Sequence, residues 1–336
     1  MKLAMRFGLS ALLPIVILAA GCGSDSSSGG TAAGGSSTNG KSPDSGKKLV
    51  VGFSQIGAES GWRTANTESI KSEAEKRGVD LKFSDAQQKQ ENQIKAIRSY
   101  IDQKVDVIAF SPVVETGWEP VLREAKAANI PVFVSDRRPD VPDDLYVTFI
   151  GSDFIEEGKR AAEWLAAKCG GKATIAELSG TPGSAPANDR KKGFTDAIAK
   201  FPGMKIVFSQ TGEFTRAKGK EVTEALLKSP QGSQITALFA HNDDMALGAI
   251  QAIEEAGKKP GKDILIVSID GVKDAFKAMS EGKLNCSVEC NPLLGPPLFD
   301  AIDAFKKGTK LPKRTVMKDG IFDETTAAKE LPTRKY

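Results

Sequence analysis

Histidine is almost absent from this chain of 336 residues, which contains His241 alone. Imidazole is the commonest metal ligand and general base in proteins, so this scarcity argues against zinc enzymes and Ser-His-Asp hydrolases. The sequence also lacks G-x-x-x-x-G-K-[ST], G-x-S-x-G, C-x-x-C and H-E-x-x-H patterns, which would indicate phosphate loops, nucleophile elbows and metal sites. We therefore expect no catalytic residue, no bound metal and no cofactor.

An excess of charge of either sign is missing as well. The chain carries 46 basic and 43 acidic residues, a net charge of +3. Such a balance does not indicate binding to nucleic acid or to another polyanion. Hydrophobic residues make up 40% of the chain and charged residues 26%, which is typical of a soluble globular protein. The length suits a leader followed by two domains.

Cysteine is scarce, with four residues at Cys22, Cys169, Cys286 and Cys290. The last three leave one thiol unpaired, so the sequence does not indicate a full disulfide framework. Cys286 and Cys290 fall in a predicted strand, where four residues of extended chain separate them by about 13 Å, too far for a disulfide. We expect buried or half-buried thiols.

The one conspicuous apolar run, residues 9–20, is too short to span a bilayer comfortably and follows Lys2 and Arg6. The run leads into L-A-A-G and then Cys22, and small residues before a cysteine resemble a lipoprotein cleavage box. We predict that residues 1–22 are a lipoprotein signal peptide and that Cys22 is lipidated, which anchors the chain to a membrane outside the cytoplasm. Ordinary secretory cleavage beside an incidental cysteine is the alternative.

Residues 23–47 have the composition of a flexible tether. Of the 24 residues from 23 to 46, 15 are Gly or Ser, and none is large and apolar. A coil of this composition has a root-mean-square reach of roughly 25–30 Å. A lipid-anchored domain needs such a linker, so the segment supports the anchor.

From residue 49 onward, short apolar runs alternate with amphipathic segments. Expected helices include residues 64–77, 91–104, 119–128 and 293–307. The expected strands are residues 49–53, 80–84, 105–110, 132–135, 146–150, 174–178, 205–209, 237–240, 264–269 and 286–289. Alternating strands and helices form parallel sheets, and ten strands with a turn-rich pause after Arg137 favour two sheets over one. We predict an α/β chain with two doubly wound, Rossmann-like lobes and a ligand site at the carboxyl ends of the strands.

Polar and aromatic side chains follow several predicted strands. They are Glu59, Ser60, Gly61, Trp62, Arg63, Asp136, Arg137, Arg190, Phe214, Asn242 and Asp270. Asp, Asn and Arg have planar groups that reach two neighbouring hydroxyls at once, and aromatic rings cover the C–H face of a sugar. The set therefore suits a monosaccharide. The alternative for a single Asp or Asn is a helix N-cap, the role we expect for Asp243 and Asp244.

Several motifs at these positions resemble those of the ribose/galactose-type periplasmic binding proteins of ABC importers. They are V-G-F-S over 51–54, D-R at 136–137, D-R-x-x-G-F over 189–194, N-D-x-M-A-x-G-A over 242–249 and I-D-G over 269–271. Four longer stretches are similar to the galactofuranose-binding members of that family: G-A-E-S-G-W-R over 57–63, Q-Q-K-Q-E-N-Q-I-K-A over 87–96, P-V-V-x-T-G-W-E-P over 112–120 and G-x-F-T-R-x-K-G-K over 212–220.

The resemblance implies a type I periplasmic binding protein fold, whose chain crosses between two lobes near Gly151, Asn291 and Gly320. The implied N-terminal lobe comprises residues 48–151 plus 291–320, and the implied C-terminal lobe comprises residues 152–290 plus 321–336. The resemblance also implies that galactofuranose or a related furanose binds at the polar and aromatic residues named above. A membrane permease of an ABC importer would then receive the sugar. We expect the protein to act as a monomer in the periplasm or at the cell surface.

Some points stay open in the sequence. Trp62 packs either against the sugar or in a lobe core, where it would position Arg63. Where ribose-type members carry a late ligand-binding glutamine, this chain has Cys290 beside Glu289. A sugar-sensing receptor that presents its ligand to a membrane signalling protein is the alternative function.

Two other classes fit less well. A transcription regulator of the same fold needs a basic helix-turn-helix headpiece, whereas residues 1–48 supply a leader and a tether. A glycosidase would have to use Glu59 and Asp270 as its paired carboxylates, and these are expected to face each other from opposite lobes.

Overall fold

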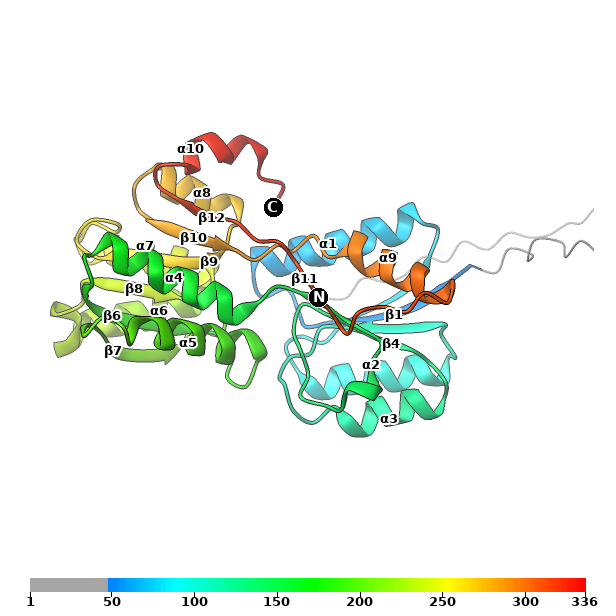
Figure 1. Ribbon diagram of the computed structural model, residues 1–336. Helices are drawn as coiled ribbons and strands as arrows, with labels where there is room; N and C mark the ends of the chain where they lie inside the picture. The colour runs from blue at the N-terminus through cyan, green and yellow to red at the C-terminus, as the bar shows by residue number, and fades with distance from the viewer. Residues whose placement is uncertain (1–47) are drawn as a thin grey trace, which may run out of the picture. The chain divides into compact units, whose positions relative to one another are not determined.

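The computed structural model describes residues 48–336, which form two six-stranded sheets covered by helices (Figure 1). The strand order of the first sheet is β11 (Arg314–Val316), β5 (Phe149–Gly151), β4 (Val132–Ser135), β3 (Val107–Phe110), β1 (Val50–Gln55) and β2 (Asp80–Asp85). The order of the second is β12 (Ile321–Asp323), β10 (Cys286–Glu289), β9 (Leu265–Asp270), β8 (Ala237–Ala240), β6 (Lys172–Ser179) and β7 (Gly203–Thr211). All neighbouring strands of these sheets pair in parallel except β10 and β12.

The helices follow the strands in the order that βαβ units require. The helices around the first sheet are α1 (Gly61–Lys76), α2 (Gln90–Asp102), α3 (Glu119–Ala127) and α9 (Gly295–Lys306). Those around the second are α4 (Phe154–Lys168), α5 (Ala185–Ile198), α6 (Arg216–Lys228), α7 (Asp243–Glu255), α8 (Lys273–Ser280) and α10 (Ala327–Glu330). The predicted two-lobed, doubly wound α/β fold is confirmed.

Side-chain alternation along the first sheet builds a core on each face. Ile108 and Phe110 of β3 join the cluster that packs under α2 and α3. Val107 and Ala109, the intervening residues, join the cluster under α1 and α9. Figure 1 shows these helix pairs on opposite faces of the sheet. A strand buried on both faces reads as a continuous apolar run, which is why β3 was recognisable in the sequence.

Two glycines allow α4 and α5 to approach each other closely. A Cβ atom on Gly158 would lie 2.1 Å from the carbonyl oxygen of Arg190, and one on Gly193 would lie 2.0 Å from the carbonyl oxygen of Ile155. Any larger residue at either position would force the helices apart. The glycine of the D-R-x-x-G-F motif therefore fixes the place of the helix that carries Arg190.

The chain passes between the two sheets at three places. These lie after β5, after β10 and between β11 and β12, so they coincide with the expected crossings near Gly151, Asn291 and Gly320. The two short strands β11 and β12 were not predicted, because three mostly exposed residues carry no periodic pattern. The exact lobe boundaries stay a prediction.

Cys169, Cys286 and Cys290 are free thiols, as expected. No described helix has the length and apolar character needed to cross a bilayer. Within residues 48–336, no group of His, Cys, Asp and Glu side chains is arranged to hold a metal ion. The predicted signal peptide, the tether and Cys22 lie outside the described residues.

Candidate functional site

A small cavity lies where the carboxyl ends of the two sheets face each other. Its walls bring together every predicted site residue except Gly61. The lining residues are Glu59, Ser60, Trp62, Arg63, Asp136, Arg137, Pro186, Arg190, Phe214, Asn242, Asp270 and Cys290. Segments from both sheets contribute, so a ligand held here touches both halves of the fold.

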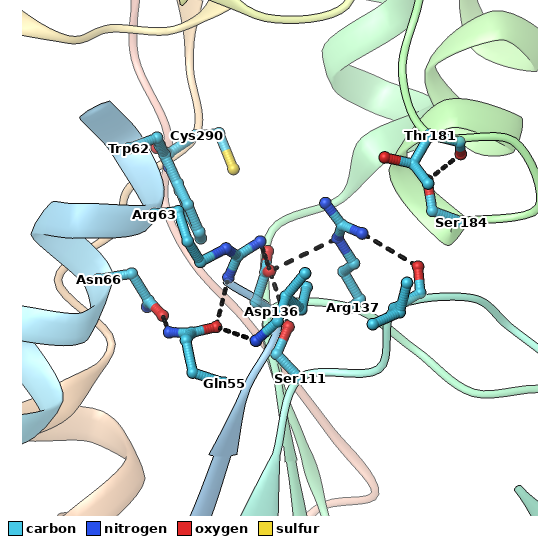
Figure 2. A network of polar contacts seen from close by, with 12 residues as sticks. Gln55, Trp62, Arg63, Asn66, Ser111, Asp136, Arg137, Thr181, Ser184 and Cys290 are labelled. Atoms are coloured by element: carbon cyan, nitrogen blue, oxygen red, sulfur yellow. Dashed lines mark hydrogen bonds and ion pairs between the residues drawn. The ribbon is translucent and has the colours of Figure 1, made fainter. Parts of the chain in front are cut away.

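Arg63 is the centre of the first-sheet wall. It lies in the first turn of α1, which begins where the side chain of Ser60 accepts a hydrogen bond from the Arg63 backbone N–H at 3.1 Å. Its Nη2 lies 2.8 Å from Oδ2 of Asp136, and its Nε donates to Oε1 of Glu59 at 3.1 Å. Nη1 donates to Oε1 of Gln55 at 3.3 Å. Figure 2 shows the contacts of Arg63 with Asp136 and Gln55. Together with the bond to Glu59, they fix the orientation of the guanidinium.

Asp136 and Arg137 stand beside Arg63 at the end of β4. Asp136 has a φ of 65°, a left-handed backbone conformation that residues other than glycine seldom adopt. Its Oδ2 accepts a hydrogen bond from Ser111 Oγ at 2.9 Å, and Nη1 of Arg137 donates to the carbonyl of Val113 at 3.0 Å. Burial and the neighbouring charge of Arg63 lower the pKa of Arg137 to about 10, so the side chain stays charged at neutral pH.

Arg190 dominates the second-sheet wall. Its Nε donates to Oε2 of Glu157 at 2.8 Å, and its Nη1 donates to the carbonyl oxygen of His241 at 2.7 Å. Nη2 lies 3.6 Å from Oδ1 of Asp270. Burial raises the pKa of Asp270 well above its ordinary value, and the positive charge of Arg190 opposes that shift. Asp270 is therefore a polar carboxyl group that water no longer solvates.

The single histidine supports this wall from behind. His241 is fully buried, and its Nε2 lies 3.1 Å from Oε1 of Glu177. Its Nδ1 accepts a hydrogen bond from the Gly180 N–H at 3.4 Å, which assigns the neutral ring with the proton on Nε2. Burial lowers the pKa of His241, in agreement with a neutral ring. The role of His241 is structural: its backbone carbonyl accepts a hydrogen bond from Arg190 and so orients that side chain.

Asn242 both lines the cavity and caps α7. Its Oδ1 accepts from the Met245 N–H at 3.0 Å, and its Nδ2 donates to the carbonyl of Phe214 at 3.1 Å. The expectation that Asp243 and Asp244 serve as N-caps is wrong. Oδ2 of Asp243 accepts from the N–H groups of Gly271 and Val272 at 2.7 and 2.9 Å, so this carboxylate shapes the turn that follows Asp270.

Gly61 and Asp244 connect the two halves of the fold. The N–H of Gly61, at the start of α1, donates to Oδ2 of Asp244 at 2.7 Å, although 183 residues separate them. Gly61 was expected in the ligand site, but the structure places it outside the cavity lining and uses its amide for this bridge. The bridge therefore joins α1, a helix of the first sheet's lobe, to α7, a helix of the second sheet's lobe.

Two aromatic side chains close the cavity. The ring of Phe214 lies 5.1 Å from the guanidinium carbon of Arg137 and 6.0 Å from that of Arg190. Trp62 contacts Arg63, whose guanidinium carbon lies 4.6 Å from the ring, and its Nε1 donates to the carbonyl of Cys290 at 2.5 Å. Trp62 therefore lines the cavity, contacts Arg63 and packs into the hydrophobic core of the second sheet, as expected of a lobe-core residue; its contact with a sugar stays a prediction. Figure 2 shows Trp62 and Cys290 together at one end of the network.

The cavity is lined by charged and polar groups. Three guanidinium groups, those of Arg63, Arg137 and Arg190, face three carboxyl groups, those of Glu59, Asp136 and Asp270. Among the described residues, Oε2 of Glu59 and Nε of Arg137 are buried and make no hydrogen bond. A neutral molecule with many hydroxyl groups both accepts and donates, so it would satisfy these atoms without adding charge.

Sequence reasoning missed several residues of the site. Cys290 was noted as a departure from the family pattern but was not assigned to the site, and Pro186 was not singled out. The sequence does not indicate Glu157, the partner of Arg190. A buried glutamate on an amphipathic helix cannot be told from an exposed glutamate before the packing of the helix is known.

A family model of the periplasmic binding protein domain matches residues 51–293. The chain belongs to this family. This periplasmic binding protein is 55% identical over 291 residues to the galactofuranose-binding protein YtfQ of Escherichia coli K12, covering 85% of this chain and 92% of that protein. The family resemblance found in the motifs is thereby confirmed.

Two solved structures are similar to this periplasmic binding protein. The binding protein of the arabinose ABC transporter from Shewanella sp. ANA-3, bound to α- and β-L-arabinofuranose, is 58% identical with a TM-score of 0.83, over 85% of this chain and 95% of that one. A protein from Mycobacterium smegmatis in complex with β-D-fucofuranose is 57% identical with a TM-score of 0.83, over 86% and 95%. These relatives bind solutes, and this protein is a binding protein, not an enzyme. The family implies an extracytoplasmic location.

Proposed function

We propose that this protein captures a furanose sugar, galactofuranose or a close relative, in the cavity between its two sheets. The observation that carries the proposal is the wall of buried guanidinium and carboxyl groups, built on the carboxyl ends of both sheets. Arg63, Arg137, Arg190, Asp136 and Asp270 are each at most 4% exposed, so their polar groups depend on each other and on a ligand for hydrogen bonds.

The furanose specificity is supported by the relatives. Proteins 55–58% identical to this chain are named for galactofuranose or hold arabinofuranose or fucofuranose. One of the four stretches that resemble galactofuranose-binding members, residues 57–63, supplies Glu59, Ser60, Trp62 and Arg63 to the cavity. We assign this segment to the exocyclic arm of the sugar, because a five-membered ring carries its remaining carbons as an arm with its own hydroxyls.

Calorimetric titration tests the proposal. D-Galactose, L-arabinose and D-fucose each form some furanose in water, and we expect all three to bind. The matched controls are the methyl pyranosides of the same sugars, which cannot open and should not bind. Binding of the methyl pyranosides at the affinity of the free sugars would contradict the furanose assignment, and no binding of any sugar would contradict the proposed function.

We further propose that an ABC permease receives the sugar and that a lipid on Cys22 holds the protein at the membrane. Two expected lobes, residues 48–151 plus 291–320 and residues 152–290 plus 321–336, would close on the ligand as a monomer. Expression of Cys22→Ala tests the anchor. Release of the variant into the soluble extracytoplasmic fraction, with the unaltered chain in the membrane fraction, is the expected result; equal membrane association of both would refute the anchor.

A further inference from the structure

The carboxylate of Glu289 joins three separate parts of the chain. It lies at the end of β10, next to Cys290, but is not part of the cavity lining. Its Oε1 accepts from Arg334 Nη2 at 2.8 Å and from the Tyr336 hydroxyl at 2.7 Å, and its Oε2 accepts from the Gly320 N–H at 2.8 Å. Glu289 therefore fastens residues 334–336 and the third crossing to the strand that leads into the second crossing.

Arg334 extends this contact to the loop after β9. Its Nη2 also donates to the carbonyl oxygen of Gly271 at 2.7 Å. The guanidinium carbon lies 4.5 Å from the ring centre of Phe276 and 4.7 Å from that of Tyr336. The Lys273 N–H donates to the carbonyl of Tyr336 at 2.6 Å, so residues 334–336 lie along this loop through backbone as well as side-chain bonds.

The loop begins at Asp270, a cavity residue with a strained backbone. Asp270 has a φ of 131° and Gly271 a φ of 77°, both in the region that L side chains avoid. Such conformations persist only where surrounding contacts fix them, and they cluster at ligand sites. The carbonyl of Asp270 accepts from the Cys290 N–H at 3.1 Å, Asp243 holds the Gly271 N–H, and Arg334 holds the Gly271 carbonyl.

We propose that Glu289, Arg334 and Tyr336 form a clasp that holds Asp270 in its strained, cavity-facing conformation and thereby sets the affinity for sugar. The three are positioning residues, since none of them lines the cavity. A site that is preorganised before binding loses less conformational entropy when the ligand arrives, so it binds more tightly. The effect on sugar affinity rests on the proposed function, whereas the hold on the Asp270 loop does not.

The test uses the full chain with Arg334→Met, Tyr336→Phe and the matched control Lys335→Met, which changes an exposed basic residue of the same segment. Hydrogen exchange without sugar is measured over residues 268–275 and 286–291. We expect faster exchange in both segments for Arg334→Met and Tyr336→Phe, and wild-type exchange for Lys335→Met. The Kd for D-galactose, measured well below the unfolding temperature, should rise about tenfold in Arg334→Met and about threefold in Tyr336→Phe.

Unchanged exchange and unchanged Kd in Arg334→Met would overturn the clasp. A lower unfolding temperature with both quantities unchanged would also overturn it, because Arg334 would then stabilise the fold without positioning Asp270. If the wild-type protein binds none of D-galactose, L-arabinose and D-fucose, the proposed function fails. The exchange rates then still decide whether the clasp holds the Asp270 loop.

Discussion

The N–H of Gly61 donates a 2.7 Å hydrogen bond to Oδ2 of Asp244, which connects the start of α1 to the start of α7. The other carboxylate oxygen, Oδ1, accepts from Arg216 Nε at 3.1 Å, so the acceptor is held in place. A bond between the two sheets that forms only when they are close favours the closed arrangement over an open one.

Asp244→Ala should therefore shift the protein towards an open form. We expect a larger radius of gyration without sugar, by small-angle scattering, and a Kd for sugar about fivefold to tenfold higher. Asp274→Ala is the matched control, because Asp274 also pairs with Arg216, at 3.0 Å, but is exposed and distant from Gly61 in the hydrogen-bond network. A radius of gyration without sugar equal to that of the wild type would contradict the role of this bridge in closure.

Asp270→Ala should abolish measurable sugar binding while the fold is retained. Loss of the acceptor leaves ligand hydroxyls unpaired in a buried site, and we expect the Kd to rise at least about 100-fold. The unfolding temperature should stay within a few degrees of the wild-type value, because the removed carboxylate is desolvated. Wild-type affinity of the variant by calorimetry would remove Asp270 from the site.

Arg63→Ala should discriminate between sugars with long and short exocyclic arms. Arg63 donates to Glu59 and contacts Asp136, so it stands where the arm of the sugar is assigned. We expect a loss of affinity of about 100-fold for D-galactose and about tenfold for L-arabinose, because the shorter arm offers fewer hydroxyls. Comparing two sugars on one variant cancels the cost of unpairing the buried carboxylates. Equal losses for both would show that Arg63 does not contact the arm.

Glu157 should make stability depend on pH near neutrality. Burial raises its pKa from 4.5 to about 7; the charge of Arg190 opposes this shift and that of Asp319 adds to it. Between pH 4.5 and 7 the folded chain keeps a proton that the unfolded chain releases, so the contribution of this group to stability falls as pH rises. We expect wild type to lose on the order of 2–3 kcal/mol relative to Glu157→Gln between pH 5 and 8. Parallel unfolding curves of the two proteins at both pH values would contradict this.

Much of the fold was predictable because its strands are buried on both faces. The run 237–240 and the run 286–289 match β8 and β10 as found. The first is a short, wholly apolar segment, A-L-F-A, of the kind that a strand buried on both faces requires. The strands β11 and β12 were missed, because their pairing depends on the sheets already being present. The local composition of these two segments does not predict a strand.

The candidate site was predictable where its residues directly follow strands. Asp136, Asn242 and Asp270 lie at the carboxyl ends of β4, β8 and β9, and parallel sheets gather such positions at one edge. Glu157 and Arg334 were not predictable. Glu157 pairs with the site residue Arg190, 33 positions further along the chain, and Arg334 donates to the carbonyl of Gly271, next to Asp270 and 63 positions away. Only the tertiary fold brings these pairs together.

The ring form of the bound sugar tests the central claim most directly. Galactose labelled with ¹³C at its anomeric carbon gives separate NMR signals for furanose and pyranose rings, free and bound. With the protein in excess we predict a bound signal of the furanose form, drawn from a solution in which pyranose prevails, and its loss in Asp270→Ala. A bound signal of the pyranose form, or a spectrum identical to that of free galactose, would contradict the account.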